Sequence, residues 1–255
     1  MIRELTFFGL TIGTYTLMAI IAAITCVAMS WGTLRKIGLS VAVTILMLST
    51  MCIAFLVGAR LWNVAVDPDS FGADRPWYIL RMTGFSMYGG ILGAILMLMI
   101  FSLITRIRLV KLLDVFTIPA AAAFSIARVG CFLNGCCYGK KTDLPWGVIF
   151  PSASDNAHQY AAHPTQIYEL LLALLGIPLC LWLVKLFKAG TGGRFFIYGV
   201  WFSTMRLAIL PLRLLPYSYN VTQYYYPLLY YVLIVIGIFL FVYTCIKNRR
   251  VSPAE

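Results

Sequence analysis

The sequence predicts an all-α integral membrane protein with seven transmembrane helices. Of its 255 residues, 61% are hydrophobic and only 11% are charged, and the mean hydropathy is +0.88. A soluble domain is roughly 45–50% apolar and about 25% charged, so this composition excludes a soluble globular enzyme and a disordered protein. Seven cysteines, most of them in apolar runs, exclude a secreted disulfide scaffold.

Seven apolar stretches meet the length of roughly 20 residues that a spanning helix requires. The first is too long for a removed signal peptide and lacks a clean cleavage site, so it is expected to be a span. The fourth and sixth are the weakest because each carries an arginine. The predicted spans are Phe7–Ser30, Leu39–Leu61, Ser86–Ile104, Leu112–Leu133, Gln166–Phe187, Phe195–Leu212 and Tyr225–Ile246.

Basic residues after spans one, three and five and in the C-terminal tail predict the orientation. These segments are short and nearly free of acids, so the positive-inside rule places them in the cytoplasm, with the N-terminus outside. About half of the charge then reflects cytoplasmic anchoring, so the net charge of +11 does not point to a nucleic-acid partner, and none is expected. Since we find no repeat, linker or low-complexity segment, residues 1–255 are predicted to form a single polytopic membrane domain.

Four further arginines lie at or just inside the outer ends of apolar runs: Arg60, Arg128, Arg206 and Arg213. A charge at membrane depth costs about 2.5–3.5 kcal/mol on the most lenient scales. Each arginine alone could reach the interface or pair with an acid, but Asp114 and Glu169 are the only acids within the spans. An unneutralised group of arginines is therefore predicted to bind the phosphate of a phospholipid headgroup, since guanidinium matches phosphate oxygens with two parallel donors.

Glycine-bearing motifs accompany these arginines. Gly89 and Gly90 open the third span, where small residues either let helices approach closely or serve a functional role. Asn134, Gly135 and Gly139 follow Arg128 in a glycine-rich segment. That segment predicts a tight turn whose exposed backbone N–H groups could bind an anion.

A polar motif, His163-Pro-Thr-Gln-Ile-Tyr-Glu169, enters the fifth span. Thr165 is expected to cap this helix, with Glu169 in its first turn, where negative charge is favoured. His163 is either a structural histidine or a functional one.

Together these motifs resemble the bacterial phosphatidylglycerol–prolipoprotein diacylglyceryl transferases. The resemblance runs through Gly58-Ala-Arg60, Ser86-Met-Tyr88-Gly89-Gly90, the Arg128-to-Gly135 block and the His163-to-Glu169 block, over roughly residues 8–240. It implies that a diacylglyceryl group moves from phosphatidylglycerol to the lipobox cysteine of a preprolipoprotein, and that glycerol phosphate leaves. The implied location is a bacterial plasma (inner) membrane, with the active site towards the outer face and membrane lipids around it.

Residue by residue, the resemblance suggests catalytic roles for Arg128 and Arg206. Tyr88 stands where the family usually has a histidine, so the base is predicted to be Tyr88, His163 or neither. The predicted substrate-binding residues are Tyr15, Arg60, Gly89, Gly90, Asn134, Gly135, Gly139, Glu169 and Arg213. Further departures from the family pattern are Cys131, Cys136, Phe202 and Leu210, which make this chain a divergent member with a cysteine-rich signature.

Several alternatives remain open at this point. The chain could be a paralogue acting on another acceptor or lipid, or a non-enzymatic bundle that binds a lipid or an anion. Cys131, Cys136 and Cys137 could serve packing, thiol chemistry or metal binding, but their spacing matches the usual C-x₂₋₄-C metal pairs poorly. We therefore expect no metal site and no cofactor.

Overall fold

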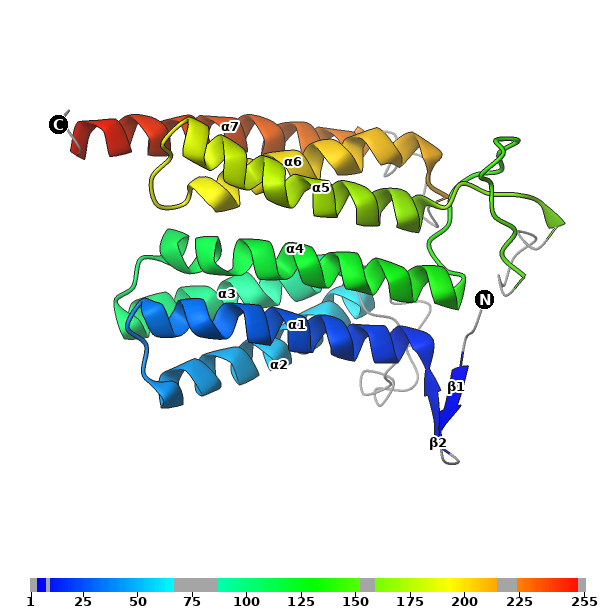
Figure 1. The fold of residues 1–255 in the computed structure, drawn as a ribbon, viewed down its shortest axis with the longest axis horizontal. Coiled ribbons are helices and arrows are strands. Elements are labelled where there is room, and N and C mark those ends of the chain that lie inside the picture. The colour runs from blue at the N-terminus through cyan, green and yellow to red at the C-terminus, as the bar shows by residue number, and fades with distance from the viewer. Residues whose placement is uncertain (1–3, 8–9, 67–86, 152–158, 215–223, 252–255) are drawn as a thin grey trace. The chain divides into compact units, whose positions relative to one another are not determined.

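The computed structural model describes residues 4–7, 10–66, 87–151, 159–214 and 224–251. Seven of its helices are long and apolar enough to cross a membrane, which confirms the predicted seven spans. The helices are drawn in Figure 1. They are α1 (Thr14–Lys36), α2 (Val41–Val66), α3 (Met87–Thr105), α4 (Leu109–Asn134), α5 (Thr165–Leu186), α6 (Gly193–Ile209) and α7 (Tyr226–Val251).

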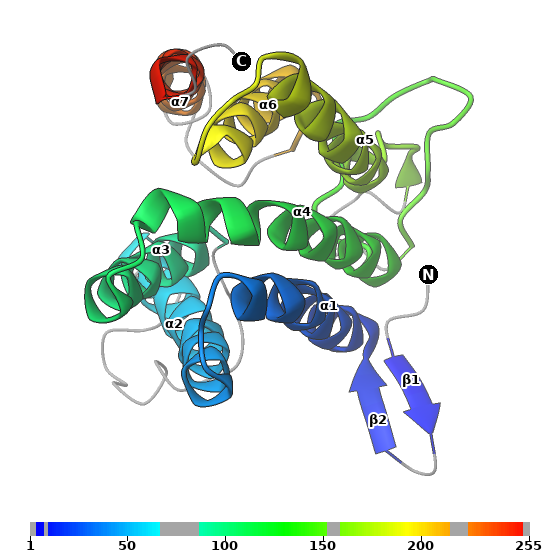
Figure 2. The same cartoon turned by 60° about the vertical axis from the view of Figure 1, so that its left-hand side comes forward.

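The predicted start of the first span at Phe7 is wrong. Two short strands, β1 (Glu4–Phe7) and β2 (Leu10–Gly13), pair antiparallel before α1 begins at Thr14. Figure 2 shows this hairpin at the N-terminal end of α1. β-Branched residues such as Thr11 and Ile12 favour strands, and an apolar run alone does not distinguish a strand from a helix.

The sixth span ends at Leu212, as predicted, but its last turn is not α-helical. Helix α6 stops at Ile209, and the 3₁₀ turn η4 (Leu210–Leu212) follows. Pro211 lacks the backbone N–H that a further α-helical turn requires. The chain then becomes extended at Arg213, so this arginine lies beyond the helix end.

Many large apolar side chains on the helices point outward, whereas several polar ones are buried. Leu103 and Phe239 are 80% and 69% exposed, while Glu169 is only 1% exposed. Lipid solvates apolar side chains, and an ion within a membrane protein usually faces the protein interior. This distribution agrees with the composition-based prediction of a membrane protein.

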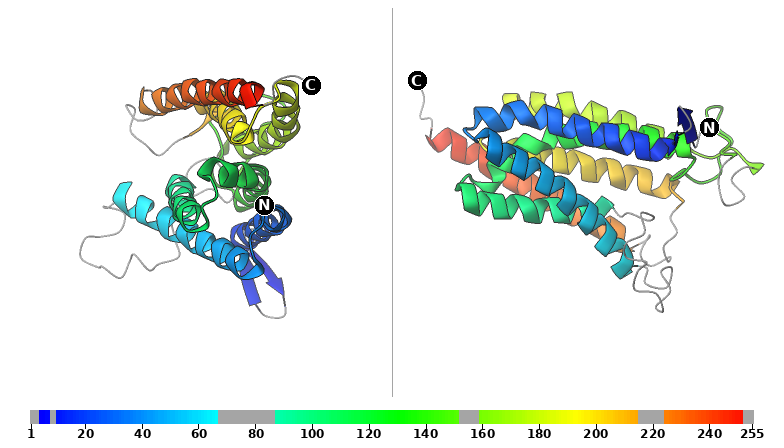
Figure 3. Two further views of the ribbon diagram at one scale, coloured as in Figure 1. Left: turned by 90° about the vertical axis from the view of Figure 1, so that its left-hand side faces the viewer. Right: turned by 90° about the horizontal axis from the view of Figure 1, so that it is seen from below.

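Residue contacts divide the chain into two compact units, Met1–Met29 with Phe116–Glu255, and Ser30–Val115. Within the first unit, α5 packs on α6 and α6 packs on α7. Within the second, α2 and α3 lie side by side, as Figures 1 and 3 show. The single membrane domain over residues 1–255 stays a prediction.

Glycines allow the close approach of α2 and α3. A Cβ atom at Gly89 would collide with the backbone carbonyl of Gly58, and one at Gly93 with that of Ala54. A Cβ at Gly90 would lie 2.6 Å from the ring of Phe55. Packing of small residues between membrane helices therefore accounts for these three glycines on the third span.

Candidate active site

Three arginines meet one buried carboxylate in the first unit. Arg128 Nε lies 2.7 Å from Glu169 Oε2, while Nη1 of Arg206 and of Arg213 lie 2.5 and 2.7 Å from Oε1. The four side chains come from α4, α5, α6 and the segment just after η4, and each is 10% exposed or less. We call these four residues the Glu169 centre.

The Glu169 centre corrects the predicted unneutralised arginine group. Within these four residues, one carboxylate lies among three guanidinium groups. Removing ions from water costs several kcal/mol each unless they are paired, so a lone cluster of three buried arginines would be unstable. The carboxylate thus holds the guanidinium groups together and leaves them able to attract an anion.

Two aromatic residues and one unused donor complete the centre. The guanidinium carbon of Arg128 lies 4.7 Å from the centroid of the Phe124 ring, and Arg206 Nε donates to Tyr230 Oη over 3.4 Å. Arg213 Nε is buried and has no hydrogen-bond partner among the described residues. A buried donor without an acceptor is costly, so this N–H is available to an anionic ligand.

Helix α4 ends in a turn whose backbone N–H groups donate hydrogen bonds to carbonyl groups of the helix itself. Gly135 has φ of +73°, its N–H donates to Phe132 O, and Cys136 N–H donates to Cys131 O over 3.1 Å. This is a Schellman motif, in which a left-handed residue lets the last N–H groups bond helix carbonyls. The N–H of Gly139 likewise donates to His163 O. These three N–H groups already have acceptors within the protein, and the substrate-binding role of Asn134, Gly135 and Gly139 stays a prediction.

The polar motif before α5 holds this turn in place. Gln166 Nε2 donates to Cys136 O over 2.7 Å, and Thr165 Oγ1 donates to Cys137 O over 2.8 Å. Pro164 occupies the N-cap position, so the prediction that Thr165 caps the helix is wrong. Glu169, expected in the first turn, lies beyond it and is explained by its ion pairs instead.

Gly139 lies where two chain segments cross. A Cβ atom there would collide with Leu212 O and would lie 2.8 Å from side-chain atoms of His163 and Thr165. Gly139 also forms an isolated β-bridge with Arg213. Close packing next to the Glu169 centre therefore requires glycine at this position.

His163 lies beside Tyr168 rather than alone. His163 Nδ1 is 3.3 Å from Tyr168 Oη, which also accepts a hydrogen bond of 2.8 Å from Trp146 Nε1. The half-buried imidazole is therefore oriented by a tyrosine of the same motif. This contact supplies a structural role for His163 and leaves its predicted role as a base untested.

The remaining predicted residues fall in both units. Tyr15 is 41% exposed near the start of α1, and its Cα would lie 3.6 Å from a Cβ atom at Gly130 of α4. Asn134 is the last residue of α4. Arg60 is buried and lies within α2, in the second unit. Tyr88, Gly89 and Gly90 lie in the first turn of α3, in the same unit.

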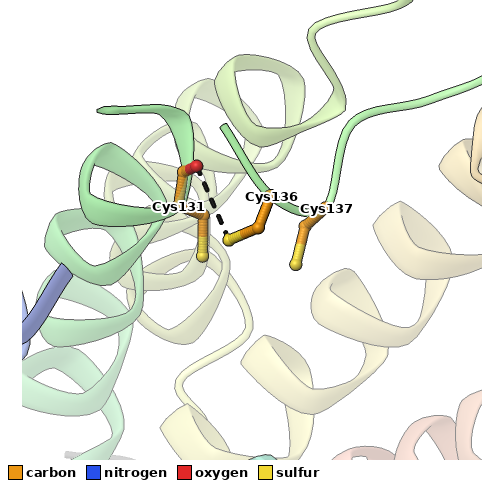
Figure 4. A group of neighbouring side chains, drawn as sticks. All are labelled: Cys131, Cys136 and Cys137. Carbon is orange, nitrogen blue, oxygen red and sulfur yellow. Dashed lines mark hydrogen bonds between the residues drawn. The ribbon is translucent and has the colours of Figure 1, made fainter. Parts of the chain in front are cut away.

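Three thiols gather at the C-terminal end of α4 (Figure 4). The sulfur atoms of Cys131, Cys136 and Cys137 lie within 4.8 Å of one another. Arg128 Nη1 lies 3.8 Å from Cys131 Sγ. Hydrogen bonds from the other two thiols, with the positive charges of Arg128 and Arg213, hold the pKa of the Cys137 thiol well below its usual value.

Three residues that contact the candidate site were not predicted from the sequence. Phe124 and Tyr230 contact the arginines, and Gln166 supports the turn. Gln166 could have been found from its place in a polar motif at the entrance of a span. Tyr230 lies in a tyrosine-rich helix end with no signal that separates it from its neighbours.

Comparison with known proteins identifies related sequences. A family model described as prolipoprotein diacylglyceryl transferase matches residues 4–248. Three curated relatives bear the name phosphatidylglycerol–prolipoprotein diacylglyceryl transferase. The Clostridium tetani protein is 36% identical over 57% of this chain and 59% of its own length. The Solidesulfovibrio magneticus protein is 34% identical over 64% of this chain and 62% of its own length. The Cupriavidus necator protein is 32% identical over 50% of this chain and 47% of its own length. The chain thus aligns with about half to three-fifths of each relative's length.

Proposed function

Since the chain belongs to the prolipoprotein diacylglyceryl transferase family, we propose that it transfers the diacylglyceryl group of phosphatidylglycerol to a lipobox cysteine of a preprolipoprotein. In this reaction the thiol sulfur bonds to the glycerol carbon that carries the phosphate. The carbon–oxygen bond to the phosphate breaks, and the oxygen keeps the electron pair as glycerol phosphate leaves. Charge therefore develops on a phosphate oxygen, and this oxygen has to be stabilised.

The Glu169 centre carries the proposal. Three arginines converge on one carboxylate, and the buried Arg213 Nε has no hydrogen-bond partner among the described residues. This arrangement suits a phosphodiester that gains charge during the reaction. The site is buried, so each hydrogen bond to the leaving group is worth more than it would be in water. Arg128, Arg206 and Arg213 would bind the phosphate, while Glu169 would fix their positions. The identity of the base stays as predicted from the sequence: Tyr88, His163 or neither.

The proposed location is the plasma membrane of a bacterium, with the site towards its outer face. The support comes from positions within the single helix α4. Lys111 lies in its first turn, and Arg128 follows 17 residues later. At about 1.5 Å per residue these positions are about 25 Å apart, close to the thickness of the hydrocarbon core. This separation supports a position for Arg128 at the membrane face opposite the basic loop, which the positive-inside rule predicts to be cytoplasmic.

The proposal is tested in a bacterial strain depleted of its own diacylglyceryl transferase. Mass spectrometry of a test lipoprotein should detect the added diacylglyceryl group when this chain is expressed. Arg128→Ala should reduce modification at least about 100-fold, as loss of a single charge-stabilising donor does in other enzymes. Arg194→Ala is the matched control, because Arg194 is exposed at the start of α6.

Normal modification by an Arg128→Ala protein at equal membrane abundance would refute the role of the Glu169 centre. Failure of the unaltered chain to modify the test lipoprotein, despite insertion, would instead favour another acceptor or a non-enzymatic lipid-binding role. Arg194→Ala removes the same charge and should modify the test lipoprotein as the unaltered chain does. The result for the unaltered chain separates the two outcomes.

A further inference from the structure

The three-thiol cluster at the end of α4 has no role in the reaction as described above. Cys131 is buried in the last turn of the helix, and Cys136 and Cys137 follow the Schellman motif. In Figure 4 the sulfur of Cys136 lies between those of Cys131 and Cys137. All three sulfur atoms lie within 4.8 Å of one another. Such convergence of three thiols needs a physical reason.

The backbone holds the thiols in this arrangement. Left-handed Gly135 turns the chain back over α4, and Cys137 itself has φ of +64°. A non-glycine residue in this region is strained, and surrounding contacts must offset the strain. Gln166 and Thr165 supply such contacts by bonding the carbonyl groups of Cys136 and Cys137. Cys136 Sγ also donates to Cys131 O over 3.7 Å. The shorter hydrogen bonds that fix the turn come from Gln166 and Thr165, so the thiols can act as ligands.

The spacing of the sulfur atoms suits a thiophilic metal ion. Zn²⁺ binds thiolate at about 2.3 Å with tetrahedral geometry, which places sulfur ligands about 3.8 Å apart. Sulfur atoms already within 4.8 Å need shifts of about 1 Å or less. Three thiolates and one Zn²⁺ carry a charge of −1 (−3 + 2), which Arg128 Nη1, 3.8 Å from Cys131 Sγ, compensates.

We propose that Cys131, Cys136 and Cys137 bind one Zn²⁺ ion and leave its fourth coordination position open. On binding, each thiol releases its proton to solvent and forms one sulfur–zinc bond, and no electron is transferred. No other cysteine, histidine or carboxylate of the described residues joins this group. Three protein ligands with an open position are typical of catalytic zinc sites, whereas structural sites have four.

The open position would take the acceptor thiol, an extension that rests on the proposed transferase function. A thiol that coordinates zinc releases its proton to solvent, and the resulting thiolate is the nucleophile that the transfer requires. Arg128 contacts both Cys131 and Glu169, so the bound sulfur would lie next to the residues proposed to bind phosphate. The sulfur then attacks the glycerol carbon, and the phosphate oxygen leaves with the electron pair. Zinc would thereby supply the thiolate without a general base.

Metal binding is tested with the full chain in detergent micelles, reduced and then stripped with a chelator. Titration with Co²⁺ should produce thiolate-to-cobalt charge-transfer absorption that saturates at one ion per chain, and Zn²⁺ should abolish it. Serine variants of the three cluster cysteines should each lose this absorption. Cys52→Ser is the matched control, since Cys52 lies in α2 and is exposed, and it should titrate like the unaltered chain.

Three results would overturn the site: no charge-transfer absorption, unchanged absorption in Cys136→Ser, or disulfide-linked cluster cysteines in protein alkylated without reductant. A synthetic lipobox peptide tests the open position. It should raise the absorption by about one third by adding a fourth thiolate to three, whereas its Cys→Ser version should not. No rise would restrict zinc to a structural role and reject acceptor binding. Because these titrations need no turnover, their failure is distinguishable from failure of the lipoprotein modification assay.

Discussion

Glu169→Gln is the most direct perturbation of the candidate site, because it removes one charge and almost no volume. The carboxylate is 1% exposed and accepts from Arg128, Arg206 and Arg213 at 2.5–2.7 Å. An amide oxygen could still accept one or two of these bonds, but its NH₂ group would face a guanidinium donor. Three buried guanidinium groups would then lie together without the carboxylate that pairs with each of them.

The cost follows from these contacts. Removing one partner of a buried ion pair typically costs 3–5 kcal/mol, because the remaining charge is left uncompensated. Glu169 has three such partners, and about 3–5 kcal/mol is therefore the smallest loss that we expect in the free energy of unfolding. Glu169→Asp should lose less, since it keeps the charge but its shorter side chain cannot reach all three arginines.

The assay is reversible unfolding in mixed micelles, read together with the modification of a test lipoprotein. Asp143→Asn is the matched control because it makes the same acid-to-amide change at an exposed position. Its free energy of unfolding should stay within about 0.5 kcal/mol of the unaltered chain. If the free energy of unfolding of Glu169→Gln also stayed within about 0.5 kcal/mol of the unaltered chain, Glu169 would not hold the three arginines together and the reasoning would fail.

Two glycine substitutions test the packing around the site. Gly135→Ala places a side chain at φ of +73° and should destabilise the protein by about 1–3 kcal/mol, whereas Gly199→Ala, with open space in α6, should be neutral or stabilise by up to about 1 kcal/mol. Equal unfolding free energies for the two variants would contradict the left-handed turn. Gly93→Ala should separate α2 from α3 because the new methyl group meets the Ala54 carbonyl, while Gly32→Ala meets nothing. A cysteine crosslink engineered between α2 and α3 should form more slowly in Gly93→Ala only, and an unchanged rate would disprove the close approach.

The sequence determined the membrane class and the seven spans because both depend on local composition. A run of about 20 apolar residues predicts a spanning helix wherever its neighbours lie. The same local reasoning failed at Phe7, since strand pairing of Glu4 with Gly13 is not encoded in an apolar run. It also singled out Arg128, Arg206 and Arg213, because charges within apolar segments are costly to keep.

Only the tertiary structure decided what these residues do together. Arg206 and Arg213 lie 37 and 44 positions from Glu169 in the chain, yet they share one of its oxygen atoms. In the turn that was predicted to bind an anion, the N–H groups of Gly135 and Cys136 donate to carbonyl groups of α4. Three cysteines converge at this end of the helix. Pairing of buried charges and clustering of ligands depend on distance in space, which follows from how the helices and their ending turns pack rather than from spacing along the chain.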